Sequence, residues 1–260
     1  MQKYLLKNIQ IVNEGRIMSA DVLISGDRIE KIAPQLGNIA SVREINGENK
    51  YLLPGAIDDQ VHFREPGLTH KGSIYTEARA GVAGGVTSFM EMPNTNPPAL
   101  TQDLLEEKYT IAANTSLANY SFYMGTSNNN MDEALKTNDK KNDICGIKIF
   151  MGSSTGNMLV DNHISLDRLF RESEVLIATH CEVEKMILDN YNRIKKEKEN
   201  LEPSDHPIIR NAEACFESSL TAIQFAKKYN SRLHILHIST ARELQLFSNM
   251  LPLEKKRITA

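Results

Sequence analysis

The sequence contains no tryptophan, only three cysteines and no long apolar run. Cys145, Cys181 and Cys215 are odd in number and lack the spacing of a metal knuckle, so they indicate neither a disulfide framework nor a cysteine metal site. No run approaches the ~18 apolar residues of a membrane span, and the first residues lack a signal-peptide profile. We therefore expect a reduced, cytoplasmic compartment and no membrane partner.

An excess of charge of one sign is also missing, because 30 basic residues stand against 33 acidic ones, a net charge of −3. This balance gives no indication of a nucleic-acid partner. Hydrophobic residues make up 41% of the 260 positions, which is enough for a sizeable core and excludes a disordered chain. The length exceeds the roughly 150 residues of a typical domain. One large domain with a small appendage is expected.

Residues 1–52 have the pattern of a small β subdomain. Short β-branched runs alternate with Gly, Asn and Asp, as in SADVLISGDRIEKIA, and this is typical of strands joined by turns. The Gly26-Asp27 pair suits the tight turn of a hairpin. We predict a β subdomain over 1–52 and a second domain over 53–260.

From residue 53 onward, short apolar strands such as VTSFMEMP and RLHILHIS alternate with helical segments, including 183–200 and 211–229. Apolar strands spaced by helices are typical of a parallel sheet covered on both faces. About six such units, with no Gly-x-Gly-x-x-Gly after the first strand, favour an α/β fold of the (β/α)8 barrel type over a dinucleotide-binding fold. A seventh strand barely begins at KRITA, so we expect a truncated barrel.

Four polar side chains lie at or near the carboxyl ends of predicted strands, where a barrel carries its active site. They are His62, Lys148, His180 and His237. A single histidine in such a place is more often structural, but three at three strand ends are typical of a metal site. His234 and His237 are three residues apart, so the strand period predicts that only one points into the barrel, and His237 is nearer the strand end.

Lys148 lies in the otherwise apolar strand ICGIKIFM. Burial can depress the pKa of a lysine by up to ~3–5 units. Two interpretations remain open: the side chain snorkels from the strand edge to solvent, or its neutral amine has reacted with carbon dioxide. The carbamate formed in that reaction is an anionic ligand that can bridge two cations about 3.5–4 Å apart.

Five segments resemble, in their order, the dihydroorotases of the amidohydrolase superfamily: LLPGAIDDQVHFREPG, EMPNT, GIKIFMGSSTGNMLVDN, THCE and HILHIST. The resemblance runs from about Lys3 to the end of the chain, and HFREPG with MPNT is its most specific part. It implies a metal-bearing (β/α)8 barrel beside a small β domain built from both chain ends. It also implies the reversible conversion of N-carbamoyl-L-aspartate to L-dihydroorotate in pyrimidine synthesis.

The resemblance further implies one or two Zn²⁺ per subunit. His62 and N-carboxylated Lys148 would hold one zinc, and Lys148, His180 and His237 would hold the other. Bound metal would activate water by lowering its pKa. The family usually has a second histidine two residues before His62, where this chain has Gln60. An amide oxygen binds zinc more weakly than imidazole, so one metal position is expected to be the weaker.

For the substrate, the resemblance implies that Arg64 takes a carboxylate and that Asn94 donates hydrogen bonds beside it. Taken by themselves, Arg64 suits a surface salt bridge and Asn94 suits a turn. Asp58 would orient an imidazole. The segment Ser153–Asn162 is either a mobile loop over the site or an ordinary connection.

The family's general acid/base is an aspartate expected beyond residue 260, so the catalytic residue is not identified and the isolated fragment is expected to be inactive. The leading hypothesis is a zinc-dependent dihydroorotase acting on a small cyclic amide. A dihydropyrimidinase-like or allantoinase-like enzyme is a second hypothesis. A third is a non-catalytic scaffold partner of aspartate transcarbamoylase, favoured by Gln60. A homodimer is also compatible with the sequence.

Overall fold

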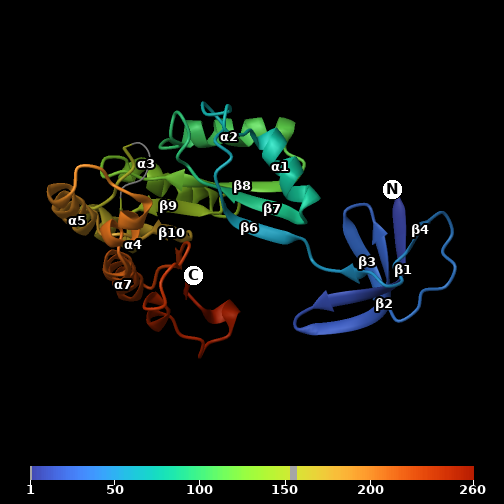
Figure 1. The fold of residues 1–260 in the computed structure, drawn as a ribbon. Coiled ribbons are helices and arrows are strands. Elements are labelled where there is room, and N and C mark those ends of the chain that lie inside the picture. Colours follow the sequence, from blue (N-terminus) through green and yellow to red (C-terminus); the bar gives the residue numbers. More distant parts are fainter. Residues whose placement is uncertain (1, 153–156) are drawn as a thin grey trace. The chain divides into compact units, whose positions relative to one another are not determined.

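The computed structural model describes residues 2–152 and 157–260. The chain divides into two compact units, Met1–Ala56 and Ile57–Ala260 (Figure 1). The sequence placed this division between residues 52 and 53. The four intervening residues include Pro54 and Gly55 and lead into the first strand of the second unit.

The first unit is a small sheet. Its strands are β1 (Lys3–Asn13), β2 (Arg16–Ser25), β3 (Arg28–Ala33), β4 (Arg43–Asn46) and β5 (Tyr51–Leu52). β2 pairs antiparallel with β1 and β3, whereas β4 and β5 pair parallel with β1. The predicted hairpin at Gly26-Asp27 is confirmed, because Ser25 pairs with Arg28 and Gly26 has a φ of 61°. Gly26 can adopt this left-handed conformation because it has no Cβ.

The second unit contains a seven-stranded sheet with the strand order β12-β11-β10-β9-β8-β7-β6. Its strands are β6 (Ala56–Val61), β7 (Val86–Glu91), β8 (Asn119–Gly125), β9 (Gly146–Phe150), β10 (Ile177–His180), β11 (Leu233–Ile235) and β12 (Ile258–Thr259). Pairing from β7 through β12 is parallel. The six predicted strands and the start of a seventh are therefore present, and the incomplete α/β barrel is confirmed.

Helices connect these strands. They are α1 (Ile74–Ala83), α2 (Gln102–Thr115), α3 (Met131–Leu135), α4 (His163–Glu172), α5 (Glu184–Glu197), α6 (His206–Ile209) and α7 (Ala212–Tyr229). Short 3₁₀ turns lie at Lys136–Lys140, Pro203–Asp205, Glu243–Leu246 and Leu253–Lys255. The helix predicted over 211–229 is confirmed: the Asn211 side chain accepts the N–H of Ala214, and Asn230 ends the helix at a φ of 55°.

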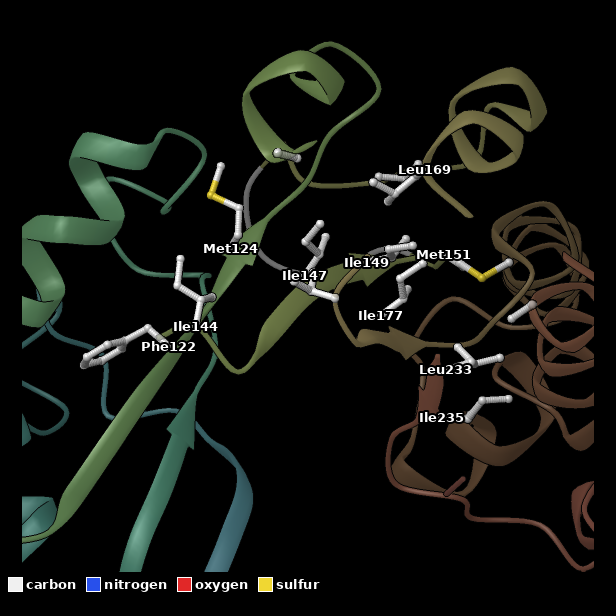
Figure 2. Close-up of a cluster of buried hydrophobic side chains, with 14 of the residues drawn as sticks. Phe122, Met124, Ile144, Ile147, Ile149, Met151, Leu169, Ile177, Leu233 and Ile235 are labelled. Atoms are coloured by element: carbon white, nitrogen blue, oxygen red, sulfur yellow. The ribbon is translucent and has the colours of Figure 1, made fainter. Parts of the chain in front are cut away.

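The main core lies between the sheet and its helices. On each of these strands, every second side chain faces this core. Figure 2 shows this for Phe122, Met124, Ile147, Ile149, Ile177, Leu233 and Ile235. The intervening residues face the other side of the sheet, where Met92, Tyr123, Ala178 and Leu236 form a separate cluster. Strand alternation thus divides the sequence into a helix-facing set and a barrel-interior set.

Candidate metal centre and carboxylate site

Lys148 belongs to the barrel-interior set. Its neighbours Ile147 and Ile149 face the helices, and its Cα is in register with Ala178 of β10. The residue is only 1% exposed, so the side chain does not snorkel to solvent. Nζ lies 3.1 Å from the Ile149 carbonyl oxygen and 4.3 Å from the centre of the Phe150 ring. Burial lowers the pKa of Lys148 to about 7, so a large fraction of the amine is neutral at physiological pH.

His180 and His237 face one another. His180 ends β10, His237 follows β11, and His180 Nδ1 lies 3.1 Å from His237 Nε2. His180 Nε2 lies 2.6 Å from Glu182 Oε2, so the proton of the neutral ring belongs on Nε2. In that tautomer His180 Nδ1 carries no proton and points at His237 Nε2.

This arrangement fits a shared cation. Two imidazole nitrogens bound to one tetrahedral zinc at about 2.0–2.1 Å lie roughly 3.3 Å apart, close to the 3.1 Å between His180 and His237. Burial, and then the charges of His180 and Lys148, lower the pKa of His237 to about 4, so its ring is neutral at pH 7. In the described residues, no three His, Cys, Asp or Glu side chains converge on a metal position. His180 and His237 alone therefore leave the coordination of a tetrahedral ion incomplete.

His62, Arg64 and Asn94 are brought together at the ends of β6 and β7. His62 Nδ1 lies 2.9 Å from Asn94 Oδ1, and Arg64 Nη1 lies 3.5 Å from the Asn94 carbonyl oxygen. With Nδ1 donating to Asn94, His62 keeps Nε2 for a metal. Although the His62 ring is exposed, the surrounding protein lowers its pKa to about 4 through desolvation, then through the charges of Arg64 and Lys148. Lys148 thus acts on both His62 and His237.

The loop that carries Arg64 is tightly fixed. Arg64 has a φ of 67°, a left-handed conformation that is uncommon for a residue with a Cβ. The Glu65 carboxylate accepts the N–H of Ile74 at the start of α1, 2.7 Å away. Gly67 has a φ of 80°, and a Cβ there would lie 1.8 Å from the Asn96 carbonyl oxygen. The HFREPG loop is therefore packed directly against the MPNT loop.

Two expectations about neighbouring residues are corrected. The Asp58 carboxylate accepts the backbone N–H of Gln60 at 3.1 Å, and Asp59 makes the contact to an imidazole instead, with Oδ2 3.0 Å from His234 Nε2. His234 also reaches Thr259, so it faces the interior as His237 does. The prediction that only one of these histidines points inward was wrong, because β11 ends at Ile235 and His237 has a φ of 43°, which breaks the strand alternation.

Glu182 is a functional candidate that the sequence interpretation missed, although it lies two residues after His180 in THCE. Its carboxylate contacts both His180 Nε2 and the guanidinium of Arg210, whose Nε lies 2.9 Å from Oε1. Burial opposes the charged carboxylate, but the contacts from His180 and Arg210 outweigh it and lower the pKa of Glu182 to about 2. A carboxylate on the outer nitrogen of a metal-binding histidine fixes the tautomer and the ring orientation.

A cavity of about 470 Å³ opens beside His180, Glu182, Arg210 and His237, within the usual range for small-molecule sites. A second cavity of about 460 Å³, beside Phe247 and Lys256, has no histidine, cysteine or carboxylate among its described lining residues. The side chains that line the first cavity therefore make it the better candidate for a small-molecule site.

The predicted Ser153–Asn162 loop lies partly outside the described residues, at 153–156. Its described end is tied down. The Val160 N–H bonds the Phe150 carbonyl oxygen at 2.9 Å, and the Asn162 side chain caps α4.

Replacing Lys148 by Met tests the burial of the amine. Without zinc or carbon dioxide, the folded lysine has a pKa of about 7 against 10.5 for the ordinary group, a difference worth about 5 kcal/mol. Between these pH values the unfolded chain binds more protons, so the free energy of unfolding should rise with pH in the wild type. Lys148→Met should lack this rise and be more stable at pH 7, as measured by urea unfolding between pH 7 and 10.

The control for this comparison is Lys141→Met, which removes an exposed amine paired with Glu174. It should keep the wild-type pH dependence. Equal slopes for the wild type and Lys148→Met would show that the Lys148 amine is not desolvated.

Replacing Glu182 by Gln tests the orientation of His180. The variant should stay folded but lose the carboxylate that fixes Nδ1 toward His237, lowering zinc affinity about 10- to 100-fold. Zinc titration with a competing chelator measures this. Glu174→Gln, which alters an exposed ion pair, should bind zinc as the wild type does. Unchanged zinc affinity in Glu182→Gln would contradict the role given to Glu182.

Comparison with known proteins gives a consistent family. No protein-family model matches the chain. The dihydroorotase of Methanosarcina acetivorans is 29% identical over 238 residues, covering 90% of this chain and 50% of the relative. The allantoinase of Solibacter usitatus is 30% identical over 251 residues, covering 93% of this chain and 53% of the relative. The chain spans about half the length of the curated relatives it matches.

Solved structures agree in fold. The L-hydantoinase (dihydropyrimidinase) of Arthrobacter aurescens has a TM-score of 0.88 and 25% identity, covering 95% of this chain and 55% of that one. The D-hydantoinase of a Thermus species has a TM-score of 0.80 and 23% identity, covering 93% and 54%, and shows the fold alone. Several further dihydroorotases match at similar identity. The chain is therefore a dihydroorotase-like member of the cyclic amidohydrolases of the amidohydrolase superfamily.

Proposed function

We propose that the chain carries the metal centre and carboxylate site of a zinc-dependent dihydroorotase, which interconverts N-carbamoyl-L-aspartate and L-dihydroorotate in pyrimidine synthesis. The observation that carries this proposal is the position of Arg64. Its guanidinium lies in the same small cluster as His62 and Asn94, beside the candidate ligands. A cyclic amide with a carboxylate on its ring would thus find a cation next to the reacting centre.

The Lys148 amine has the state that carboxylation requires. In that reaction the neutral nitrogen bonds the carbon of carbon dioxide and loses a proton, which leaves a carbamate anion. The pKa of about 7 supplies the neutral nitrogen, and burial would shield the product from water. The change also replaces a buried cation with an anion that bound cations would neutralise.

The three histidines divide the ligand role. His62, with Nδ1 turned to Asn94, would present Nε2 to one zinc together with carboxylated Lys148. His180 and His237 would present their facing nitrogens to the other. Bound zinc would lower the pKa of water and polarise the ring carbonyl. Gln60 takes the place of a further imidazole, so we expect the His62 side to bind metal less tightly. The general acid/base is not assigned to a residue of this chain.

Two other functions deserve comparison with this proposal. An allantoinase or a dihydropyrimidinase is compatible with the matched relatives, but neither allantoin nor dihydropyrimidine needs a carboxylate partner such as Arg64. A non-catalytic scaffold bound to aspartate transcarbamoylase is favoured only by Gln60. Zinc content and an added mass of about 44 Da on Lys148, from covalent carbon dioxide, would distinguish an enzyme from such a scaffold.

Cellular setting and assembly are part of the same proposal. The three cysteines are free, which supports a reducing, cytoplasmic compartment. No helix in the described residues is long and apolar enough to cross a membrane. A homodimer and an association with aspartate transcarbamoylase remain predictions.

Replacing Arg64 by Met tests the proposed substrate. Loss of a charged hydrogen-bond partner typically costs about 1.5–3 kcal/mol, so we expect kcat/KM for dihydroorotate to fall roughly 10- to 150-fold in the native enzyme. Zinc content should be unchanged, because Arg64 is not a ligand. The control is Arg79→Met, which removes an exposed arginine that contacts Tyr75 on α1. Equal turnover of dihydroorotate by Arg64→Met and wild type would contradict the carboxylate role.

A further inference from the structure

A buried carboxylate, Glu243, lies shortly after His237 in the sequence and lines the same cavity. The residue is only 3% exposed. Its two oxygens each accept a hydroxyl, Oε1 from Ser219 at 2.7 Å and Oε2 from Thr240 at 2.8 Å. Buried polar groups are normally satisfied in this way, but here the donors belong to different elements, Ser219 to α7 and Thr240 to the loop after β11. The Glu243 carboxylate therefore joins this loop, residues 237–243, to the helix.

Arg242 makes a second attachment to the same helix. Its Nη1 pairs with Glu213 Oε2, and its guanidinium carbon lies 4.1 Å from the centre of the Phe216 ring. Glu213, Phe216 and Ser219 follow one another at intervals of three residues, so they lie on one face of α7. Two consecutive residues of the loop are thus held by one face of the helix.

The backbone at His237 depends on such support. His237 has a φ of 43°, a left-handed conformation that persists in a residue with a Cβ only where the surrounding structure holds it. The Ser239 hydroxyl donates to the His237 carbonyl oxygen at 2.8 Å, and Thr240, the next residue, donates to Glu243. These contacts lead from the left-handed residue to α7. The backbone conformation in turn sets the direction in which the His237 ring leaves the chain.

The beginning of α7 also supports the other facing histidine. Arg210, just before the helix, contacts Glu182, and Glu182 contacts His180. The Val183 N–H bonds the Ala214 carbonyl oxygen at 3.1 Å, which joins the chain after His180 to the first turn of α7. One helix therefore carries the supports of both facing rings.

We propose that Glu243 is a positioning residue for His237. By joining the 237–243 loop to α7, it sets the distance and the direction of the His237 ring relative to His180. This inference rests on the proposed function for the zinc that the two rings would share. It does not rest on that function for the placement of the loop, which is observable without metal.

Two substitutions at Glu243 test the role of its hydroxyl contacts. Glu243→Leu removes both contacts. Glu243→Gln retains an oxygen that accepts one hydroxyl, and its amide N–H can donate to the oxygen of the other. In the native full-length enzyme we expect Glu243→Leu to lower zinc affinity about tenfold or more, measured by titration against a competing chelator. Glu243→Gln should bind zinc nearly as tightly as the wild type does.

A third variant perturbs the fold less. Ser219→Ala removes only the donor on α7 and introduces a better helix former, so the protein should fold as the wild type does. It should lower zinc affinity in the same direction as Glu243→Leu, because the loop loses its bond to the helix.

The matched control is Tyr229→Phe, which removes a hydroxyl that donates to the Asp167 carboxylate at the other end of α7. It should bind zinc as the wild type does. A purely structural contact would lower the free energy of unfolding in urea without changing the zinc affinity of the folded protein. Wild-type zinc affinity in Glu243→Leu and Ser219→Ala would therefore overturn the inference, as would equal losses in Glu243→Gln and Glu243→Leu.

A measurement without metal separates this inference from the proposed function. Crystals of the metal-free Glu243→Leu protein should show the 237–243 loop moved away from α7 and the His237 ring displaced from His180. Glu243→Gln should keep both in place. An unmoved His237 ring in Glu243→Leu would contradict the positioning role. If the wild type binds no zinc, the proposed function fails, whereas the crystal comparison still decides whether Glu243 positions His237.

Discussion

The candidate site depends on the removal of one amine from water. Lys148 stands between two isoleucines that face the helices, so strand alternation directs its side chain into the barrel interior. There, burial lowers its pKa to about 7, at a cost of about 5 kcal/mol if the charge were kept. Desolvation therefore destabilises the charged form of Lys148 and at the same time produces the neutral nitrogen on which the proposed metal chemistry rests.

The remaining site residues are placed by backbone that departs from regular strand geometry. His237 and Arg64 both have positive φ angles, 43° and 67°, and both come just after a strand has ended. Such conformations persist only where the surrounding structure holds them. Around Arg64 this is achieved by the close approach of Gly67 to Asn96 and by the Glu65 bond to the start of α1. The site is thus built by loops that are fixed against strand ends.

Two carboxylates of the second unit pair with a cation, and burial affects the two pairs differently. Glu182 is held by Arg210 and directs His180, so this pair acts on the orientation of an imidazole. Glu91 pairs with Lys108, but burial outweighs the charge of Lys108 and raises the pKa of Glu91. Glu182 differs, because its contacts with His180 and Arg210 outweigh burial and keep the carboxylate charged.

Local pattern alone determined the small β subdomain, the strand–helix alternation and the hairpin at Gly26-Asp27, because these follow from periodicity and turn chemistry over a few residues. The strand ends supplied His62, Lys148, His180 and His237, and the motif resemblance supplied Arg64 and Asn94. Only the tertiary structure showed that Lys148 is buried, that His234 also points inward, that Asp59 rather than Asp58 reaches an imidazole, and that Glu182 contacts His180. These contacts join residues distant in sequence or depend on one left-handed backbone angle, and strand periodicity carries no information about either.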